Sequence, residues 1–232
     1  MHERRSAGPA ARKYPGPLDT GLGGTGLVAD DLYLLAHDDR TGRALLPPRP
    51  LGTGLAGALL AELMLARLIS LRSDTTVMVA YDAPPAAVRE HVLLALIASE
   101  PGPQPVTAWL GYLGQTAVRD VAARLEQAGY LTRVRSRVPG RGGRMVPVNP
   151  DWAFAPVTRV RPALDPARQV TAYAAALAGL AVASGLGFRL DQYQAQTGRN
   201  AGDAVTHLPP DLRQLITQTQ ITVSSAVLSH RT

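Results

Sequence analysis

TAVRDVAARLEQAGYLTRVRSRVPGRGGRMVPV, residues 116–148, predicts a helix that leads directly into a β-hairpin. Its first apolar residues recur with helical spacing from Thr116 to Ala128, and Gly129 is a typical helix stop. The later glycines readily adopt the positive φ angles that a hairpin reversal requires. We therefore expect a first strand at residues 130–138, a turn at 139–143 and a returning strand at 144–148.

Five arginines make this hairpin basic. Arg133, Arg135 and Arg137 alternate with other residues, so their side chains should share one face of the strand. Arg141 and Arg144 follow in the turn and the returning strand. One interpretation is an edge hairpin whose charges keep it soluble and unpaired. The other is an element that contacts an anion or a partner protein.

The positive charge of the chain is concentrated around this hairpin. The 232 residues carry a net charge of +6, and the segment from Arg133 to Arg168 holds eight arginines against Asp151 and Asp165. A local basic surface attracts the phosphates of lipid head groups or of nucleic acids. Lys13 is the only lysine, and arginine favours bidentate phosphate contacts.

The composition favours a non-enzymatic protein of the reducing compartment. With 46% apolar residues and 5% aromatic ones, the core must consist mainly of Leu, Ala and Val. There is no cysteine, and the five histidines lie far apart, so we expect no metal and no cofactor. We find neither a phosphate-binding loop nor a nucleophile elbow.

Residues 1–26 lack the apolar run of a signal peptide and predict a disordered tail.

Helices and two short strands are expected before the hairpin. Asp30 and Asp31 suit the positive end of a helix dipole, and adjacent helical residues diverge too far to form a catalytic pair. Glu62 should pair with an arginine or face solvent, with a general base as the alternative, and Trp109 should anchor the core. The expected helices are 27–37, 54–68 (capped by Thr53 after a loop at 43–50), 84–99 and 106–113, and the strands are 69–71 and 75–81.

The segment after the hairpin supplies the centre of the expected fold. Residues 149–167 are Pro-rich and predict irregular structure, whereas 169–188 contain no charged residue. This run reaches the minimum length of a membrane span, but it consists mostly of Ala and Gly, which also suits a helix in the middle of a soluble bundle. We favour the central core helix. A last amphipathic helix is expected at 209–228.

The order of these elements permits a DNA-binding interpretation. Residues 106–113, then 116–128, then the basic hairpin follow the order of helix, recognition helix and wing in winged-helix proteins. Arg141 and Arg144 would then contact backbone phosphates. The would-be recognition helix, however, carries two acids beside two arginines and few side chains suited to base edges.

Five motifs in order resemble the Golgi phosphoprotein 3 family. The chain opens with an acidic-leucine helix and an Asp-x-x-Gly turn, continues with a Gly-Leu-x-Gly…Glu-Leu helix, and has a tryptophan after a Pro-containing loop. A helix leading into a hairpin and a late apolar helix complete the resemblance. The matching stretches are DDLYLLAHDDRTG (30–42), GLAGALLAEL (54–63), VTAWL (106–110) with Trp109, RLEQAGYLT (124–132) and LAGLAVASGL (177–186).

This resemblance implies a mainly α-helical single domain, residues 27–232, with a central Ala/Leu-rich helix and a projecting basic hairpin at about 131–148. It implies a bacterial relative of peripheral membrane proteins that bind phosphatidylinositol 4-phosphate at the cytoplasmic face of a membrane. It also implies a homo-oligomer that assembles through the hairpin, and possible protein clients. We expect anionic phospholipid head groups as partners ahead of nucleic acid, and keep an oligomerisation scaffold as a further alternative.

The resemblance also indicates where a head group would bind. The family pocket uses a Trp and an Arg around the start of the Gly-Leu-x-Gly helix and two basic residues early in the helix before the hairpin. This chain lacks those basic residues, and Arg49 and Arg119, which lie close to the same positions, are our candidates for supplying the positive charge instead. The residues that replace the family's own are Pro47, Ala56, Gln115 and Val118. Arg133, Arg135, Arg137, Arg141 and Arg144 are the candidate membrane or oligomer contacts.

Overall fold

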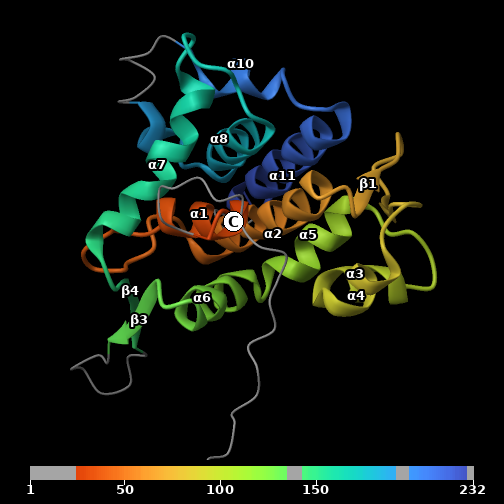
Figure 1. Ribbon diagram of the computed structural model, residues 1–232, viewed down its shortest axis with the longest axis horizontal. Coiled ribbons are helices and arrows are strands. Elements are labelled where there is room, and N and C mark those ends of the chain that lie inside the picture. Colours follow the sequence, from red (N-terminus) through yellow and green to blue (C-terminus); the bar gives the residue numbers. More distant parts are fainter. Residues whose placement is uncertain (1–24, 135–142, 192–198, 229–232) are drawn as a thin grey trace, which may run out of the picture.

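Helix α8, Ala172–Ser184, is enclosed by other helices in the upper half of the view in Figure 1. Almost all of its side chains are buried, on every side of the helix. Small Ala and Gly side chains allow neighbouring helices to approach from several directions. The prediction of a central apolar core helix is confirmed. Among the residues that the structure describes, no helix is long and apolar enough to cross a membrane.

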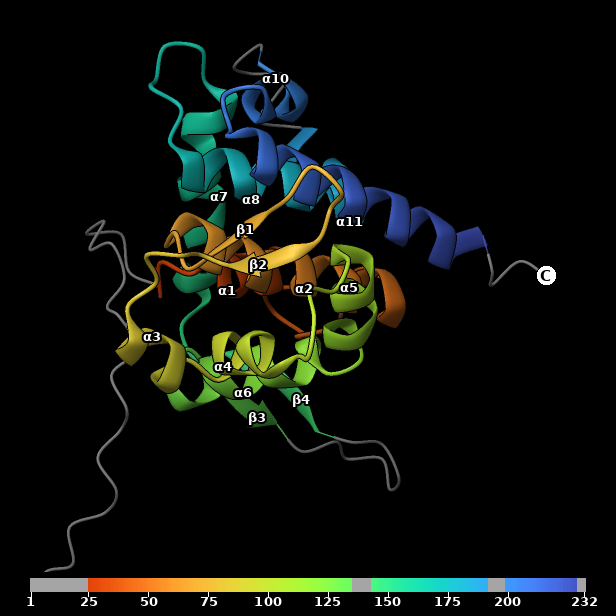
Figure 2. The same ribbon diagram turned by 90° about the vertical axis from the view of Figure 1, so that its right-hand side faces the viewer.

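The computed structural model describes residues 25–134, 143–191 and 199–228. These form a mainly helical body, as expected, with two small antiparallel sheets (Figures 1 and 2). The other elements are α1 (Val28–Leu35), α2 (Pro48–Leu65), β1 (Ile69–Leu71), β2 (Val77–Val79), α3 (Pro85–Glu90), α4 (Val92–Ser99), α5 (Val106–Gly114), α6 (Ala117–Gln127), β3 (Leu131–Val134), β4 (Arg144–Pro147), α7 (Pro150–Leu164), α10 (Ala201–Val205) and α11 (Pro210–Leu228).

Helix α2 begins earlier than the sequence predicted. It starts at Pro48 rather than Gly54, so the expected loop at 43–50 ends sooner and Thr53 lies buried inside the helix instead of capping it. Proline is well suited to a first helical turn, because its φ is already helical and the N–H it lacks would have no helical partner there. Pro48 and Pro50, in the first turn of α2, therefore indicated the start of a helix and not a loop.

Helix α7 contradicts the expectation of irregular structure at 149–167. It spans fifteen residues with Pro156 and Pro162 inside it. The side chain of Asn149 caps its start by accepting the N–H of Asp151 at 2.9 Å. Each internal proline removes one helical hydrogen bond, and the buried packing of the helix offsets that loss. The buried contacts come from distant parts of the chain.

The single helix expected at 84–99 is interrupted. His91 has an extended backbone (φ −95°, ψ 109°) that separates α3 from α4. Its Nδ1 accepts the N–H of Leu94 at 3.4 Å, so the imidazole caps the second helix. Val92, the first residue of α4, is 72% exposed. A change of direction at His91 turns that residue away from the core.

Glycines set the spacing around α2, which contacts α1, α5, α8 and α11. A Cβ added to Gly54 would lie 2.1 Å from the hydroxyl of Ser184 on α8, and one added to Gly57 would lie 2.6 Å from the hydroxyl of Thr219 on α11. Trp109 on α5 is 4% exposed, which confirms it as a core residue. The core thus depends on close backbone approach as well as on large side chains.

Candidate functional site

The hairpin forms directly after α6. Gly129 has φ +79°, and the N–H of Tyr130 then bonds the carbonyl of Leu125, which closes the helix and turns the chain into β3. In the antiparallel pairing of β3 with β4, Leu131 lies opposite Pro147 and Val134 opposite Arg144. Both predicted strands are present among the described residues, and residues 135–138 of the first one lie outside them. Arg135, Arg137 and Arg141 lie outside the described residues.

The two described arginines of the hairpin lie on opposite faces of the ribbon. Arg133 is paired in register with Met145, and Val134 with Arg144; partners in register share a face, and successive residues alternate. Arg133 is 64% exposed on its side chain and contacts Glu126 of α6 at 3.5 Å. Arg144 is exposed and has no carboxylate of a described residue within 4 Å.

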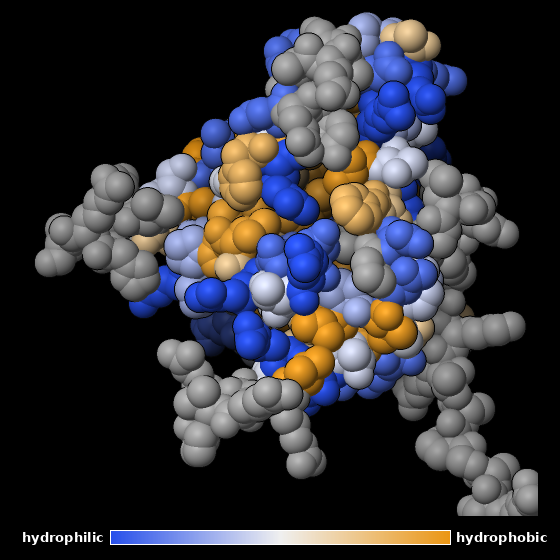
Figure 3. Space-filling model, turned by 90° about the vertical axis from the view of Figure 1, so that its left-hand side faces the viewer, coloured by the Kyte–Doolittle hydropathy of each residue, from blue (hydrophilic) through white to orange (hydrophobic). Residues whose placement is uncertain are grey.

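Exposed apolar side chains accompany these arginines. Val134, Val148 and Phe154 are about half exposed or more, at 50%, 54% and 56%. They belong to β3, to the link after β4 and to the first half of α7. Figure 3 views the side of the molecule on which α7 and the hairpin lie, and shows apolar side chains gathered beside strongly hydrophilic ones. The hairpin and the start of α7 therefore form a mixed cationic and apolar surface.

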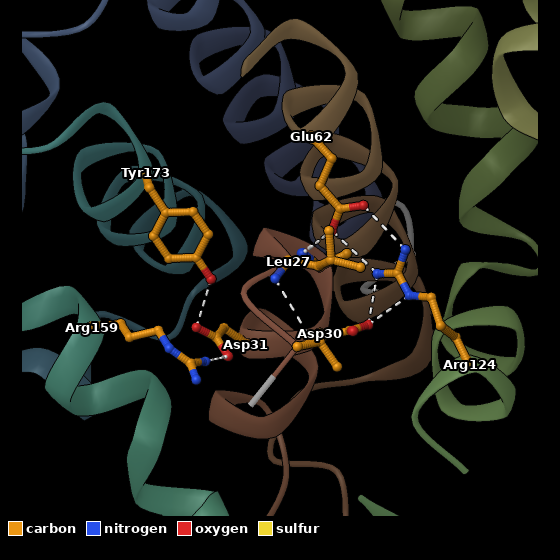
Figure 4. A network of polar contacts seen from close by, with 9 residues as sticks. Leu27, Asp30, Asp31, Glu62, Arg124, Arg159 and Tyr173 are labelled. Atoms are coloured by element: carbon orange, nitrogen blue, oxygen red, sulfur yellow. Dashed lines mark hydrogen bonds and ion pairs between the residues drawn. The ribbon is translucent and has the colours of Figure 1, made fainter. Parts of the chain in front are cut away.

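Not every arginine of the basic segment contributes to that surface. Arg159 of α7 is buried, and its Nη1 donates to Oδ1 of Asp31 on α1 (Figure 4). The hydroxyl of Tyr173 on α8 donates to Oδ2 of the same Asp31 at 2.6 Å. Arg168 is paired with Asp165 at 3.3 Å. The charge excess predicted for residues 133–168 is thus only partly a surface charge.

A second buried pair lies beside the first. Arg124 of α6 inserts its guanidinium group between two carboxylates (Figure 4). Its Nε donates to Oδ1 of Asp30 at 2.8 Å, and its Nη1 donates to Oε2 of Glu62 at 3.1 Å. Glu62 Oε1 also accepts the N–H of Ala29 at 2.7 Å. Glu62 is therefore a paired acid, and Asp30 and Asp31 bind arginines instead of merely complementing a helix dipole.

Burial dominates the electrostatics of these acids. It raises the pKa of Asp30, Asp31 and Glu62, while the guanidinium groups beside them oppose that rise. Burial likewise raises the pKa of Tyr173, and the neighbouring Asp31 carboxylate adds to the effect. Each acid is therefore held by its arginine partner at a site that water reaches poorly. Removing one partner of such a buried ion pair greatly lowers the free energy of unfolding, because the other charge stays buried without its partner.

The candidate head-group residues lie at the surface near the junction of α5 and α6. Arg49 is exposed in the first turn of α2. The start of α2 packs closely on the end of α5: a Cβ added to Gly52 would lie 2.2 Å from the carbonyl oxygen of Gly114. Arg119 is 78% exposed and contacts Asp120 at 3.1 Å. The structure brings the two helix starts together but shows no contact between Arg49 and Arg119.

The four positions that the sequence resemblance aligns with a head-group pocket have different environments. Pro47 and Gln115 are exposed and Val118 is half-buried, so all three could border a surface site. Ala56 is fully buried in α2, where a head group could not reach it. Among the described residues, no group of three or more His, Asp or Glu is arranged to hold a metal ion.

The buried ion pairs are the feature that the sequence did not reveal. Arg124 lies 94 residues from Asp30, and Arg159 lies 128 residues from Asp31. Only the adjacency of the two acids in an otherwise apolar helix was a signal, and a helix dipole explained it equally well. The partners could be identified only once the helices were placed in space.

Comparison with known proteins supplies one match. The model of the family described as Golgi phosphoprotein 3 (GPP34) matches residues 28–219. That range begins with α1 and ends within α11. No curated protein matches the chain.

Proposed function

The chain belongs to the Golgi phosphoprotein 3 family, and we propose that it is a non-enzymatic protein that docks on anionic phospholipid at the cytoplasmic face of a membrane. The observation that carries this proposal is the combination of exposed Arg133 and Arg144 with exposed Val134, Val148 and Phe154 around the hairpin. Family membership is consistent with a lipid-binding or adaptor role.

The two kinds of side chain would act together. Each arginine near an anionic membrane surface contributes about 1 kcal/mol of binding free energy. Apolar side chains that enter the boundary between head groups and acyl chains add an attraction that salt does not screen. Arg133 contributes less than Arg144, because Glu126 is already close to it. A self-associated form would present several such hairpins at once and bind more tightly.

Vesicle sedimentation tests the docking surface. A variant with Arg133→Ala and Arg144→Ala should bind vesicles of phosphatidylcholine and phosphatidylserine about 5- to 30-fold more weakly, since the two charges are together worth about 1–2 kcal/mol when Glu126 weakens the contribution of Arg133. The matched control removes two exposed arginines, Arg72 and Arg213, from the β1–β2 connection and α11. Figure 1 shows β1 and the β3–β4 hairpin on opposite sides of the body. Equal losses in both variants would reduce docking to non-specific attraction and contradict the proposal.

A phosphoinositide is the more specific ligand that we propose. A phosphate monoester carries nearly two negative charges, and bidentate arginine contacts hold it well. Arg49 and Arg119 are the candidates for those contacts. An Arg49→Ala/Arg119→Ala variant should bind vesicles that contain phosphatidylinositol 4-phosphate more weakly than the parent does. Its binding to phosphatidylserine vesicles of the same charge should be unchanged. Equal binding of variant and parent to both vesicles would exclude these two residues from a head-group site.

No structural observation favours the winged-helix alternative. The would-be recognition helix α6 directs Arg124 into the buried pair with Asp30 and Glu62. Arg119, its other arginine, is paired with Asp120. The exposed part of α6 thus offers little positive charge to a DNA groove.

A further inference from the structure

The hairpin is flanked by two helices that are fastened to adjacent residues of α1. Before it, α6 is held by Arg124 on Asp30, with Nη2 and Oδ1 2.6 Å apart. After it, α7 is held by Arg159 on Asp31. Figure 4 shows the two arginines reaching α1 from opposite sides. One turn of α1 therefore holds the chain on both sides of the hairpin.

A third contact comes from the turn that follows α1. Gly42 has φ +62°, and a Cβ there would lie 1.9 Å from the carbonyl oxygen of Met145 on β4. The turn is itself fixed by Asp38, whose Oδ1 accepts the N–H and the hydroxyl of Thr41, each at 2.7 Å. The backbone of this turn therefore lies directly against the base of the hairpin.

Further hydrogen bonds orient Asp31 and Glu62, the second acid that binds Arg124. Asp31 accepts a hydrogen bond from Tyr173 of α8, and the Glu62 that shares Arg124 accepts one from the backbone of α1. A buried ion pair contributes little net stability compared with apolar packing, but its geometry is narrow and its disruption is costly. Such a narrow geometry would favour one arrangement of the helices that carry the pair.

We propose that Asp30 and Asp31 are positioning residues that fix the orientation of the hairpin relative to the helical core. Asp30 fixes the β3 side through α6, and Asp31 fixes the β4 side through α7. The face of the hairpin that carries Arg144 and Val134 is thereby held in one orientation relative to the core, with Arg133 on the opposite face. The orientation itself does not depend on the proposed function, whereas its effect on membrane docking rests on it.

Charge gives this inference a distinctive consequence. Replacing Asp31 by Asn removes a negative charge from a chain of net charge +6, so attraction to anionic vesicles alone would become stronger. If the hairpin loses its fixed orientation, binding becomes weaker instead. When the competent orientation falls to about one third of the population, the apparent affinity falls about threefold.

Spin labels can measure the orientation directly, because the chain has no cysteine to interfere. One label at the exposed Val148, directly after β4, and one at Gln220 on α11 report the distance between the β4 side of the hairpin and the core. A second pair, Thr107 on α5 with Gln220, reports the core alone. We expect Asp31→Asn and the milder Tyr173→Phe to broaden the first distance distribution and to leave the second one sharp.

Ser184→Ala is the matched control, since it also removes a buried hydroxyl from α8, bonded to the carbonyl of Leu180 at 2.7 Å. It should lower stability without broadening either distribution. If Asp31→Asn fails to fold, Tyr173→Phe carries the test. Unchanged hairpin distances in every folded variant would overturn the inference. Broadened distances with unchanged vesicle binding would uphold the positioning role and contradict docking through the hairpin.

Discussion

Asp31 accepts hydrogen bonds from two different helices, and its loss should be among the most damaging changes of a single side chain. Asp31→Ala would leave the guanidinium group of Arg159, whose side chain is 4% exposed, without its carboxylate partner. We expect the free energy of unfolding to fall by about 3–5 kcal/mol, because arginine cannot escape by losing its proton. Urea denaturation measures this loss.

An exposed pair provides the comparison. Asp120→Ala removes the partner of Arg119 at the surface, and it should change the unfolding free energy by less than about 1 kcal/mol. If the two variants proved equally stable, the buried pair would have no special structural role.

His37 should make the fold sensitive to mild acid. Burial lowers the pKa of this imidazole, although its Nδ1 bonds the carbonyl oxygen of Tyr33 at 2.7 Å, which opposes the effect. Because the folded-state pKa lies below the unfolded value, the stabilisation is present above the unfolded pKa and is lost as the pH falls through the folded one. We expect the unfolding free energy to decrease from pH 7 towards pH 5 in part through His37.

A His37→Gln variant isolates this contribution. At neutral pH it should be less stable than the parent, since it loses the stacking on Tyr33, whose ring centroid is 3.9 Å away. On acidification the difference between the two proteins should shrink, and groups that titrate in both cancel. A gap that stays constant from pH 7 to pH 5 would mean that His37 does not titrate in this range.

At the scale of elements, the packing of α2 on α8 leaves no room for a methyl group. Gly54→Ala would place Cβ 2.1 Å from the Ser184 hydroxyl and 2.9 Å from its Cβ. We expect a loss of about 1–3 kcal/mol of unfolding free energy from overpacking. Gly111, on the exposed side of α5, has nothing within 4 Å of an added Cβ. Gly111→Ala should therefore stabilise by about 0.5–1 kcal/mol, as expected for a helix interior.

A double variant locates the cause. Adding Ser184→Gly to Gly54→Ala removes the clashing side chain, so the combined loss should be smaller than the sum of the two single losses. Strict additivity, measured by urea denaturation, would show that the cost of Gly54→Ala arises elsewhere.

The same elements show what local sequence can predict. Apolar spacing identified α5, α6, α8 and α11, and the glycine after α6 identified the hairpin that follows. Proline misled the prediction twice, at the start of α2 and throughout α7, because its local preference does not decide the outcome. Pro48 sits where its missing N–H is harmless, and α7 is held by packing and by Arg159 on another part of the chain.

At the scale of the molecule, the candidate surface was only partly predictable. The sequence proposed Arg133 and Arg144 as hairpin arginines because charge and strand alternation are local properties, and both side chains are exposed. It could not reveal that Arg124 and Arg159 face inward, since their partners are distant in sequence and two helices must be placed before the pairs exist. Counting charges along a segment therefore overstated the basic surface.

Because Arg124 of α6 is buried in an ion pair, a last prediction can distinguish membrane docking from DNA binding. Both are electrostatic, so a salt titration weakens them alike. Duplex DNA added to protein on phosphatidylserine vesicles at equal phosphate concentration should displace little of it. The reason is that α6 exposes Arg119 beside Asp120 and commits Arg124 to the core, whereas Val134 and Phe154 gain contacts only from a lipid surface. Efficient release by DNA would show that charge alone holds the protein, and the apolar half of the docking surface would then have no function there.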